Sequence, residues 1–536
     1  MNDTASRGQN ALRRAAVGLW PLLYLVAPAA LLVPAVGPHR SPGLPAEPLF
    51  ATLVSGAQVQ RWLTGADLWG VTGLIEGAFP YYWPAQLSVA GPLAVLRFVL
   101  SEPFSYGLLL LVALWFAGLG PALLARRLLG REQHAAWLIA GLAVQLSPPV
   151  LRCAWDGQLA VLGVGPLCLA LAARRGWAAF GWGLLAGGMG AVTAGLAALS
   201  AILDRRWWAI SALLPPVLLA AVLWGYQGSA PLPGSTTAPV ELAFTPAYVG
   251  TNGAVFPRVG EQAWPTSRSE PGRPWTSLPA RLHGGPLALL GCLLGLAWRR
   301  VRPWALLGLG ALLLLHLGLG PMPPPGVEAG EPAAWLAFLF GGLPGGAGPP
   351  ELLIPVVLAA GLGLGALVGW RREASVLVLA VCLWTSPLLP LGRLPVTNLP
   401  PLPAADALAA LEPGPVLLLP VVESPFRQAG AGDAELMHLA ARIHRPLPLD
   451  MGACGIPLVA HISRIADLPV HQGAAEAIWS NRDQVPLDAA RAQGFRGLIL
   501  DTESLTPTQL GLIRLDLQRS LGPPIAEGER WLVWGL

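Results

Sequence analysis

The stretch PFSYGLLLLVALWFAGLGPALLARR, residues 103–127, decides how this chain folds. It is a long apolar run that ends in an arginine pair, Arg126 and Arg127, with Arg131 shortly after. About 20 apolar residues in a helix cross the ~30 Å hydrocarbon layer of a bilayer. Arginines in short loops stay on the cytoplasmic side of the membrane. The stretch therefore predicts a membrane-spanning helix whose C-terminal end lies in the cytoplasm.

Composition indicates that most of the chain belongs to the same class of protein. Of its 536 residues, 54% are hydrophobic and 12% are charged, and the mean hydropathy is +0.56. A globular domain carries roughly 25% charged residues, so most of this chain needs a lipid bilayer to cover its surface. The net charge of +4 comes from arginines that stand in pairs at span ends. Nucleic-acid binding would need basic residues gathered on one exposed face, so it is excluded.

Arginine placement predicts the orientation of the spans. Arg13 and Arg14 keep the N-terminus in the cytoplasm, and the later pairs then fall at inner turns. We predict an α-helical polytopic membrane bundle of about 10 to 12 spans. It covers residues 1–390, with outer loops at 37–103, 227–285 and 320–351. The protein is then a multi-pass protein of the cell inner (plasma) membrane with a periplasmic or external C-terminus. The expected spans cover residues 17–36, 104–125, 135–150, 159–173, 208–226, 286–298, 304–319, 352–370 and 375–388, with two short helices around 187–195.

From about residue 391 the sequence changes character, because charged residues become common and apolar runs become short. Thr506 is the expected N-cap of an amphipathic helix with Pro507 at its first position. Strands that alternate with helices indicate a small soluble α/β domain, residues 391–536, outside the cytoplasm. The expected strands are residues 416–422, 498–501 and 531–534, and the expected helices are residues 434–443 and 506–521.

Four groups of local stretches resemble segments of a known family. They are Gly65-Ala66-Asp67-Leu68-Trp69 with Phe79-Pro80-Tyr81-Tyr82-Trp83-Pro84; Leu146-Ser147-Pro148-Pro149 with Asp156-Gly157-Gln158; the loop from Leu336 to Pro350; and Leu419-Pro420 with Arg445-Pro446-Leu447-Pro448-Leu449. In their order along the chain, these stretches resemble the corresponding segments of a poorly characterised bacterial branch of the GT-C class of membrane glycosyltransferases. The layout of spans, outer loops and terminal domain resembles that class as well. Two positions depart from that pattern. Gln158 stands where a histidine often stands, and Glu351 stands near the place of the late-loop arginines.

The resemblance implies that an Asp or Glu in the first outer loop acts as a base or binds a metal beside the sugar phosphate. A carboxylate within hydrogen-bond reach can take the proton of an attacking hydroxyl. Positive charge offsets the charge that develops on the leaving lipid phosphate. Glu47 and Asp67 are the catalytic candidates. The candidates for substrate binding are Glu76, Tyr81, Tyr82, Trp83, Gln86, Arg61, Arg97, Arg152, Asp156 and Gln158.

Simpler roles stay open for several of these residues. Asp67 also fits the start of a helix, and Tyr81, Tyr82 and Trp83 also fit an interfacial aromatic belt. The histidines show no regular ligand spacing, so the ligands of any metal are unknown. A divalent metal is a candidate cofactor only through the family resemblance.

The resemblance implies a membrane glycosyltransferase. It would transfer a sugar, such as a hexosyl group, from a polyprenyl-phosphate-linked donor to an envelope glycan or lipid acceptor. The alternative is a catalytically inactive membrane scaffold of the same fold, or an envelope-glycan-binding protein. A transporter is the third hypothesis and ranks last. Transporters usually show charged residues within spans and internal repeats, and this sequence shows neither.

Overall fold

The structure is a computed structural model of the whole chain. Its described residues form eleven ranges and ten single positions. The ranges are 20–43, 47–65, 87–147, 150–151, 286–318, 349–385, 396–399, 405–419, 487–502, 505–528 and 530–536, and the single positions are 154, 168, 172, 438, 439, 441, 442, 445, 458 and 462. The expected span at 208–226 and the short helices around 187–195 lie outside the described residues, as does nearly all of the expected span at 159–173.

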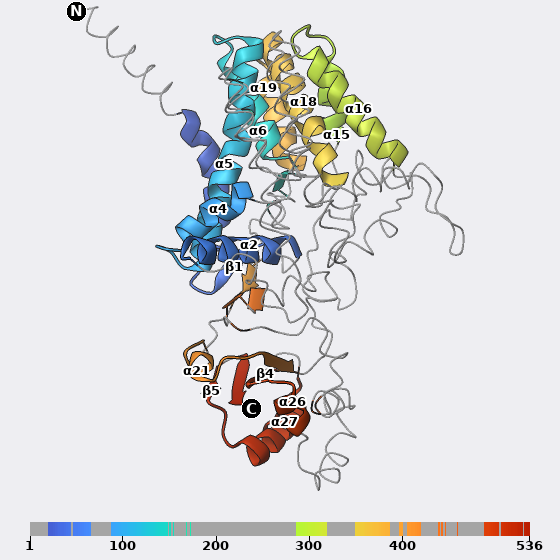
Figure 1. Cartoon of the computed structure of the whole chain (residues 1–536). Coiled ribbons are helices and arrows are strands. Elements are labelled where there is room, and N and C mark those ends of the chain that lie inside the picture. Colours follow the sequence, from blue (N-terminus) through green and yellow to red (C-terminus); the bar gives the residue numbers. More distant parts are fainter. Residues whose placement is uncertain are drawn as a thin grey trace, which may run out of the picture. The chain divides into compact units, whose positions relative to one another are not determined.

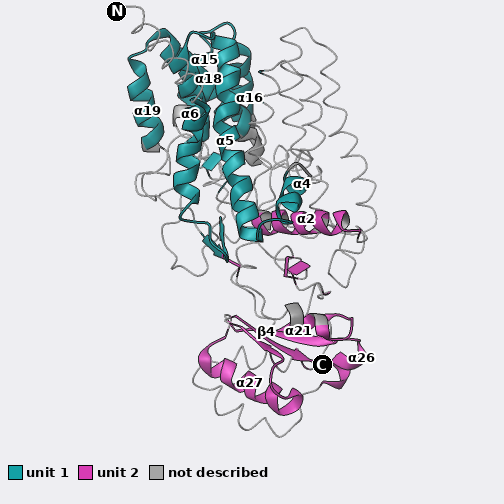
Figure 2. Cartoon of the chain, turned by 90° about the vertical axis from the view of Figure 1, so that its left-hand side faces the viewer, with its two compact units in different colours: residues 1–44, 81–397 teal, residues 45–80, 398–536 magenta. Residues whose placement is uncertain are grey.

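The chain divides into two compact units (Figure 2). The first, here called the helical unit, comprises Met1–Leu44 and Tyr81–Thr397. The second, called the α/β unit, comprises Pro45–Pro80 and Asn398–Leu536. The α/β unit thus joins a segment of the expected first outer loop to the terminal residues. The domain boundary at residue 391 stays a prediction.

Apolar helices form the helical unit (Figure 1). Every expected span within the described residues coincides with one of them. Among the described residues, α5 is the one helix that is both long and apolar enough to cross a membrane on its own. The helices are the first helix Trp20–Leu32, α4 (Leu87–Leu96), α5 (Glu102–Leu129), α6 (His134–Gln145), α15 (Pro286–Gly295), α16 (Arg302–Gly318), α18 (Pro349–Trp370) and α19 (Ala374–Thr385).

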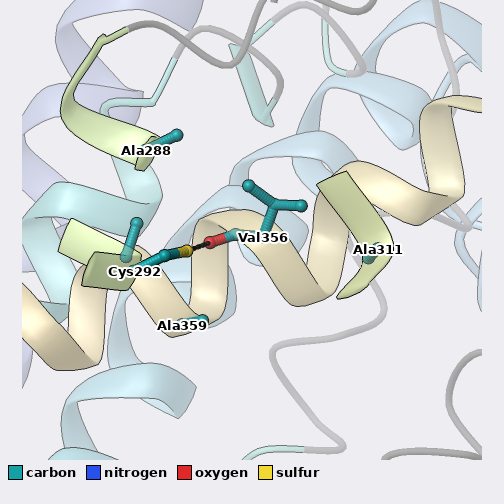
Figure 3. Close-up of a cluster of buried hydrophobic side chains, with 6 residues drawn as sticks. Ala288, Cys292, Ala311, Val356 and Ala359 are labelled. Carbon is teal, nitrogen blue, oxygen red and sulfur yellow. Dashed lines mark hydrogen bonds between the residues drawn. The ribbon is translucent and has the colours of Figure 1, made fainter. Parts of the chain in front are cut away.

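Among the described helices of this unit, α18 packs against α5, α6, α15, α16 and α19. Pro349 and Pro350 begin it, where proline is favourable because the first helical N–H groups need no partner within the helix. The Sγ of Cys292 on α15 donates a hydrogen bond to the carbonyl oxygen of Val356 at 3.5 Å (Figure 3). Small side chains surround this contact, in a buried cluster of Ala288, Cys292, Ala311, Val356, Ala359 and Ala360.

Glycines on α18 allow its neighbours to approach at backbone distance. A Cβ on Gly361 would lie 2.8 Å from the carbonyl oxygen of Ala140, and one on Gly365 would lie 2.6 Å from that of Ala136. These glycines stand four positions apart and therefore share the helix face that packs on α6. Such small-residue seams let helices pack closely where there is no hydrophobic drive between them.

The arginine-bearing turns gather at one end of the helical unit. Gly369 at the end of α18 lies against Gln133 at the start of α6, and Gly295 at the end of α15 lies against Gly363 of α18. The turns α5–α6, α15–α16 and α18–α19 therefore lie at the same end. They carry Arg126, Arg127, Arg131, Arg299, Arg300, Arg302, Arg371 and Arg372.

A buried amide ties the first helix to α5 and α6. The Nε2 of Gln145 donates to the carbonyl oxygens of Tyr24 at 2.6 Å and Leu114 at 2.9 Å. In an unbroken helix the Tyr24 carbonyl would accept from the residue four positions later, which is Pro28 and has no N–H. Gln145 therefore satisfies a carbonyl that proline leaves without its helical partner. In return, the Tyr24 hydroxyl donates to the carbonyl oxygen of Leu138 on α6 at 3.0 Å.

The α/β unit contains a four-stranded sheet in the order β3-β4-β6-β5. Strands β3 and β4 are parallel, whereas β4–β6 and β6–β5 are antiparallel. Leu498, Ile499 and Leu500 of β4 are all fully buried, as expected for a central strand covered on both faces. The strands are β3 (Val416–Leu419), β4 (Gly497–Asp501), β5 (Ala526–Glu527) and β6 (Trp531–Gly535). A separate two-stranded sheet pairs β1 (Arg40–Pro42) with β2 (Val396–Asn398).

Helix α27 (Pro507–Leu521) follows β4 and begins as predicted. Thr506 is its N-cap, and its Oγ1 accepts from the backbone N–H of Gln509 at 3.3 Å. The Oε1 of Gln509 accepts from the backbone N–H of Thr506 at 2.8 Å, which completes a capping box. Ile513 and Leu517, one turn apart, are fully buried. At the far end, the Nε1 of Trp534 on β6 donates to the carbonyl oxygen of Gly522 at 3.1 Å.

The side chain of one arginine, Arg445, caps the C-terminal end of the short helix α21 (Ala405–Ala410). The Nη2 of Arg445 donates to the carbonyl oxygens of Leu408 and Leu411, at 2.5 Å and 2.7 Å, and its Nη1 donates to that of Glu412 at 2.8 Å. The last carbonyls of a helix have no intrahelical partner, and a cation there is favourable to the helix dipole. Arg445, which is part of one stretch that carries the family resemblance, thus has a structural role in the α/β unit.

Candidate functional site

The structure places three of the twelve candidate residues on described elements. Glu47 is the first residue of α2 (Glu47–Leu63), Arg61 lies in the last turn of the same helix, and Arg97 follows α4. Of these, Glu47 and Arg61 belong to the α/β unit and Arg97 to the helical unit. The other nine lie outside the described residues: Asp67, Glu76, Tyr81, Tyr82, Trp83, Gln86, Arg152, Asp156 and Gln158.

The sequence analysis interpreted residues 37–103 as an outer loop, so it assigned neither α4 nor α2 as a helix. The apolar side chains of α2 recur at helical spacing, and Leu49 and Leu53, four positions apart, are both fully buried. Phe50 and Ser55, on other sides of the helix, are also buried, so the helix is enclosed on more than one side. The helix ends before Gly65, whose φ of +89° suits the left-handed conformation that terminates many helices.

The two ends of α2 carry opposite charges. Glu47 opens the helix and Arg61 lies in its last turn. A carboxylate is favourable near the positive end of the helix dipole, and a cation near the negative end. The placement fits a structural role for both residues, and the role of Glu47 as a general base stays a prediction.

Arg97 is held by a carboxylate that the sequence analysis missed. Its Nη1 donates to the Oε1 of Glu102 at 2.5 Å, and the two side chains are only 16% and 13% exposed. Glu102 lies in the first turn of α5, so the helix dipole also favours its negative charge. The sequence does contain a signal for this pair, because the acidic residue Glu102 stands at the start of an apolar span, five positions after Arg97. To contact a phosphate, the guanidinium of Arg97 must therefore either leave the Glu102 carboxylate or bind both anions at once.

Exposed apolar residues flank Arg97 and Glu102 in the sequence, at the end of α5 opposite the arginine-bearing turns. Val95, Phe98, Val99, Leu100 and Phe104 are all exposed, and Val99 reaches 85%. Exposed apolar side chains beside a charge pair suit the boundary between the acyl chains and the headgroups of a bilayer.

A ring contact links α2 to the terminal residues within the α/β unit. The rings of Phe50 and His438 have centroids 5.5 Å apart and planes tilted by 44°. Both side chains are 3% exposed. The described positions of the expected helix 434–443, which are His438, Leu439, Ala441 and Arg442, are helical. No sequence pattern pointed to this contact, because its two rings come from segments far apart in the chain.

A largely buried ion pair joins two strands of the sheet in the α/β unit. Arg530 donates to both carboxylate oxygens of Asp501, Nε to Oδ1 at 3.0 Å and Nη2 to Oδ2 at 2.7 Å. Its guanidinium also lies 4.4 Å from the ring centroid of Trp531. Both charges are satisfied and the side chains are 11% and 13% exposed. This pair joins the end of β4 to the start of β6, so its role is structural.

Across the part of the chain that the structure describes, no three His, Cys, Asp or Glu residues are grouped as metal ligands. Asp67 and Glu76 lie outside that part, and of Glu47 only the backbone position is described. The divalent metal stays a prediction, and no chemical step is assigned to it.

The fold of this chain is similar to that of solved structures at low sequence identity. The particular structures that this chain resembles are two cryo-EM classes of a mutant of the arabinofuranosyltransferase AftD from Mycobacteria. Their TM-scores are 0.52 and 0.53, at 16% and 15% identity over 96% and 97% of this chain. The chain spans 41% of the length of each AftD chain.

A crystal structure of ArnT from Cupriavidus metallidurans, bound to undecaprenyl phosphate, is more distant. Its TM-score is 0.39 at 13% identity, and the match covers 96% of this chain and 98% of the ArnT chain. No family model matches the sequence, and neither does any curated protein.

Proposed function

We propose that this chain is a membrane glycosyltransferase that moves a sugar from a polyprenyl-phosphate-linked donor to an envelope glycan or lipid acceptor. The observation that carries the proposal is the likeness in fold to an arabinofuranosyltransferase over 96% of the chain. The apolar surface around Arg97 and Glu102 supports a lipid-borne phosphate as the anionic part of the donor.

The proposed chemistry is a displacement at the anomeric carbon of the donor sugar. An oxygen of the acceptor hydroxyl forms the new bond to this carbon, and the bond from the carbon to the phosphate oxygen breaks. A carboxylate, Glu47 or Asp67, takes the hydroxyl proton. The electron pair of the broken bond stays on the lipid phosphate, whose growing charge an arginine offsets. Arg97 and Arg61 are candidates for this contact, with Arg152, Glu76, Tyr81, Tyr82, Trp83, Gln86, Asp156 and Gln158 as further candidates for substrate binding.

A transfer assay tests the proposal. The full chain is reconstituted in lipid nanodiscs and supplied with a radiolabelled polyprenyl-phosphate sugar and an envelope glycan extract. We expect label to move to the acceptor, and transfer to stop when the protein is omitted. Glycan binding without any transfer, from arabinosyl and hexosyl donors alike, would instead favour the scaffold or glycan-binding alternative.

We further propose that the protein is a multi-pass inner-membrane protein, with the arginine-bearing turns in the cytoplasm and the α/β unit outside. The collection of eight arginines at one end of the helical unit supports this orientation. A reporter that is active only in the cytoplasm should give no signal when fused after Leu536, and a strong signal when fused after Arg131. A strong signal at Leu536 would reverse the orientation.

A further inference from the structure

Helix α2 occupies an unusual position in the division of the chain. Its sequence lies between the first helix and α4, both of which belong to the helical unit. Its contacts nevertheless group it with the terminal residues, in the α/β unit. The helix that begins with the candidate base is therefore structurally part of the terminal unit.

The contact between Phe50 and His438 is one described link between α2 and the terminal residues. Ring centroids 5.5 Å apart fall in the range of favourable aromatic pairs, about 4.5–7 Å. Because both rings are almost completely buried, neither can turn away without opening a cavity. His438 stands on a helical stretch of the terminal residues, so the contact joins one helix to another.

Phe50 is three positions after Glu47. Residues three apart lie on neighbouring positions of one helix face, less than a full turn of about 5.4 Å apart along the axis. A side chain that fixes Phe50 therefore also fixes the height and rotation of the first turn of α2. Reacting groups displaced by about 1 Å can cost on the order of 10²-fold in rate.

We infer that His438 is a positioning residue: it packs on Phe50 and holds the first turn of α2, and with it Glu47, in the geometry needed for sugar transfer. The terminal part of the chain then acts on the reaction through the first-loop helix. The catalytic half of this inference rests on the proposed function, whereas the packing half does not.

The test measures packing and catalysis separately in the full chain in nanodiscs. Hydrogen exchange reports the protection of α2 amides, and the transfer assay reports kcat and the KM for the donor. In His438→Ala we expect α2 amides to exchange about tenfold faster, because an aromatic pair and its buried area are lost. We expect kcat to fall by about 10- to 100-fold with a nearly unchanged KM, because the first turn of α2 is displaced while donor contacts elsewhere persist.

Two further variants separate positioning from general damage. His438→Phe keeps a ring of similar size and should restore both α2 protection and kcat, which a requirement for the imidazole nitrogens would not allow. Phe495→Leu is the control, since this ring is buried beside β4 in the same unit. It should loosen the β4 amides while leaving α2 protection and kcat close to wild type. If His438→Ala does not fold, Phe50→Leu tests the same contact from the other side.

The outcomes distinguish the inference from the proposed function. Unchanged α2 protection in both His438→Ala and Phe50→Leu would overturn the inference even if the wild type transfers sugar. Faster α2 exchange without a change in kcat would overturn the positioning role. Faster α2 exchange in a protein that shows no transfer at all would leave the packing half intact and overturn the proposed function.

Discussion

Replacing Gly363 by leucine should abolish most of the folded protein recovered from membranes. A Cβ at Gly363 would overlap the backbone of α15, lying 2.9 Å from both the Gly291 carbonyl carbon and the Gly295 nitrogen. These are backbone atoms of a packed helix, so no side-chain rotation relieves the overlap. Overpacking typically costs about 1–3 kcal/mol, and separating α15 from α18 along their whole contact should exceed that range. Gly363→Ala should already lower the melting temperature of the detergent-solubilised protein.

The control for this prediction lies on a neighbouring helix. A Cβ added to Gly310 of α16 would have nothing within 4 Å, so Gly310→Ala meets no overlap. Alanine favours a helix over glycine by about 1 kcal/mol, and Gly310→Ala should therefore melt at the wild-type temperature or slightly above it. Equal melting temperatures for Gly363→Ala and Gly310→Ala would mean that the close approach of α15 and α18 is wrong.

Replacing Glu47 by glutamine should lower kcat for sugar transfer by about 10²- to 10⁴-fold, as is typical when a general base is lost. The amide keeps the size and shape of the side chain but cannot accept the proton of the acceptor hydroxyl. The donor KM should change little, because the proton is taken in the transition state and not on binding. Asp67→Asn is the parallel variant, and the larger loss identifies the base.

The matched control is Glu412→Gln in the same unit. The Glu412 side chain is 77% exposed and faces Arg496 at 3.4 Å on the surface, so its amide should leave transfer unchanged. The decisive result is the combined variant, Glu47→Gln with Asp67→Asn. Wild-type transfer by this double variant, at normal expression, would remove both carboxylates from the mechanism and leave the scaffold as the better description.

Several helices were predictable because each carries its own signal in the sequence. Helices α5, α16 and α18 are apolar runs with arginines at one end, and both the run and the charge can be read without knowledge of the neighbours. Helix α27 was predictable to the residue, since Thr506 and Pro507 form a local start signal. By contrast, α2 lacks an arginine pair and mixes Thr52 and Ser55 with its apolar residues, so it was interpreted as loop.

The contacts that organise the candidate site could not be predicted in the same way. Arg97 was identified as a candidate, but its pairing with Glu102 depends on the geometry of the turn between α4 and α5. The contact of Phe50 with His438 and the order β3-β4-β6-β5 depend on which distant segments meet. Sequence periodicity reports the face that a segment buries, but it does not report the partner that covers it.

The amide of Gln145 has a consequence for biogenesis. Its two acceptors, the carbonyl oxygens of Tyr24 and Leu114, belong to helices that leave the ribosome before α6 does. An amide that enters hydrocarbon without a partner is costly, but α6 would enter a membrane in which both acceptors are already in place. The order of synthesis thus matches the order in which the hydrogen bonds become available. A chain that began after α5 would have to insert Gln145 with neither acceptor present.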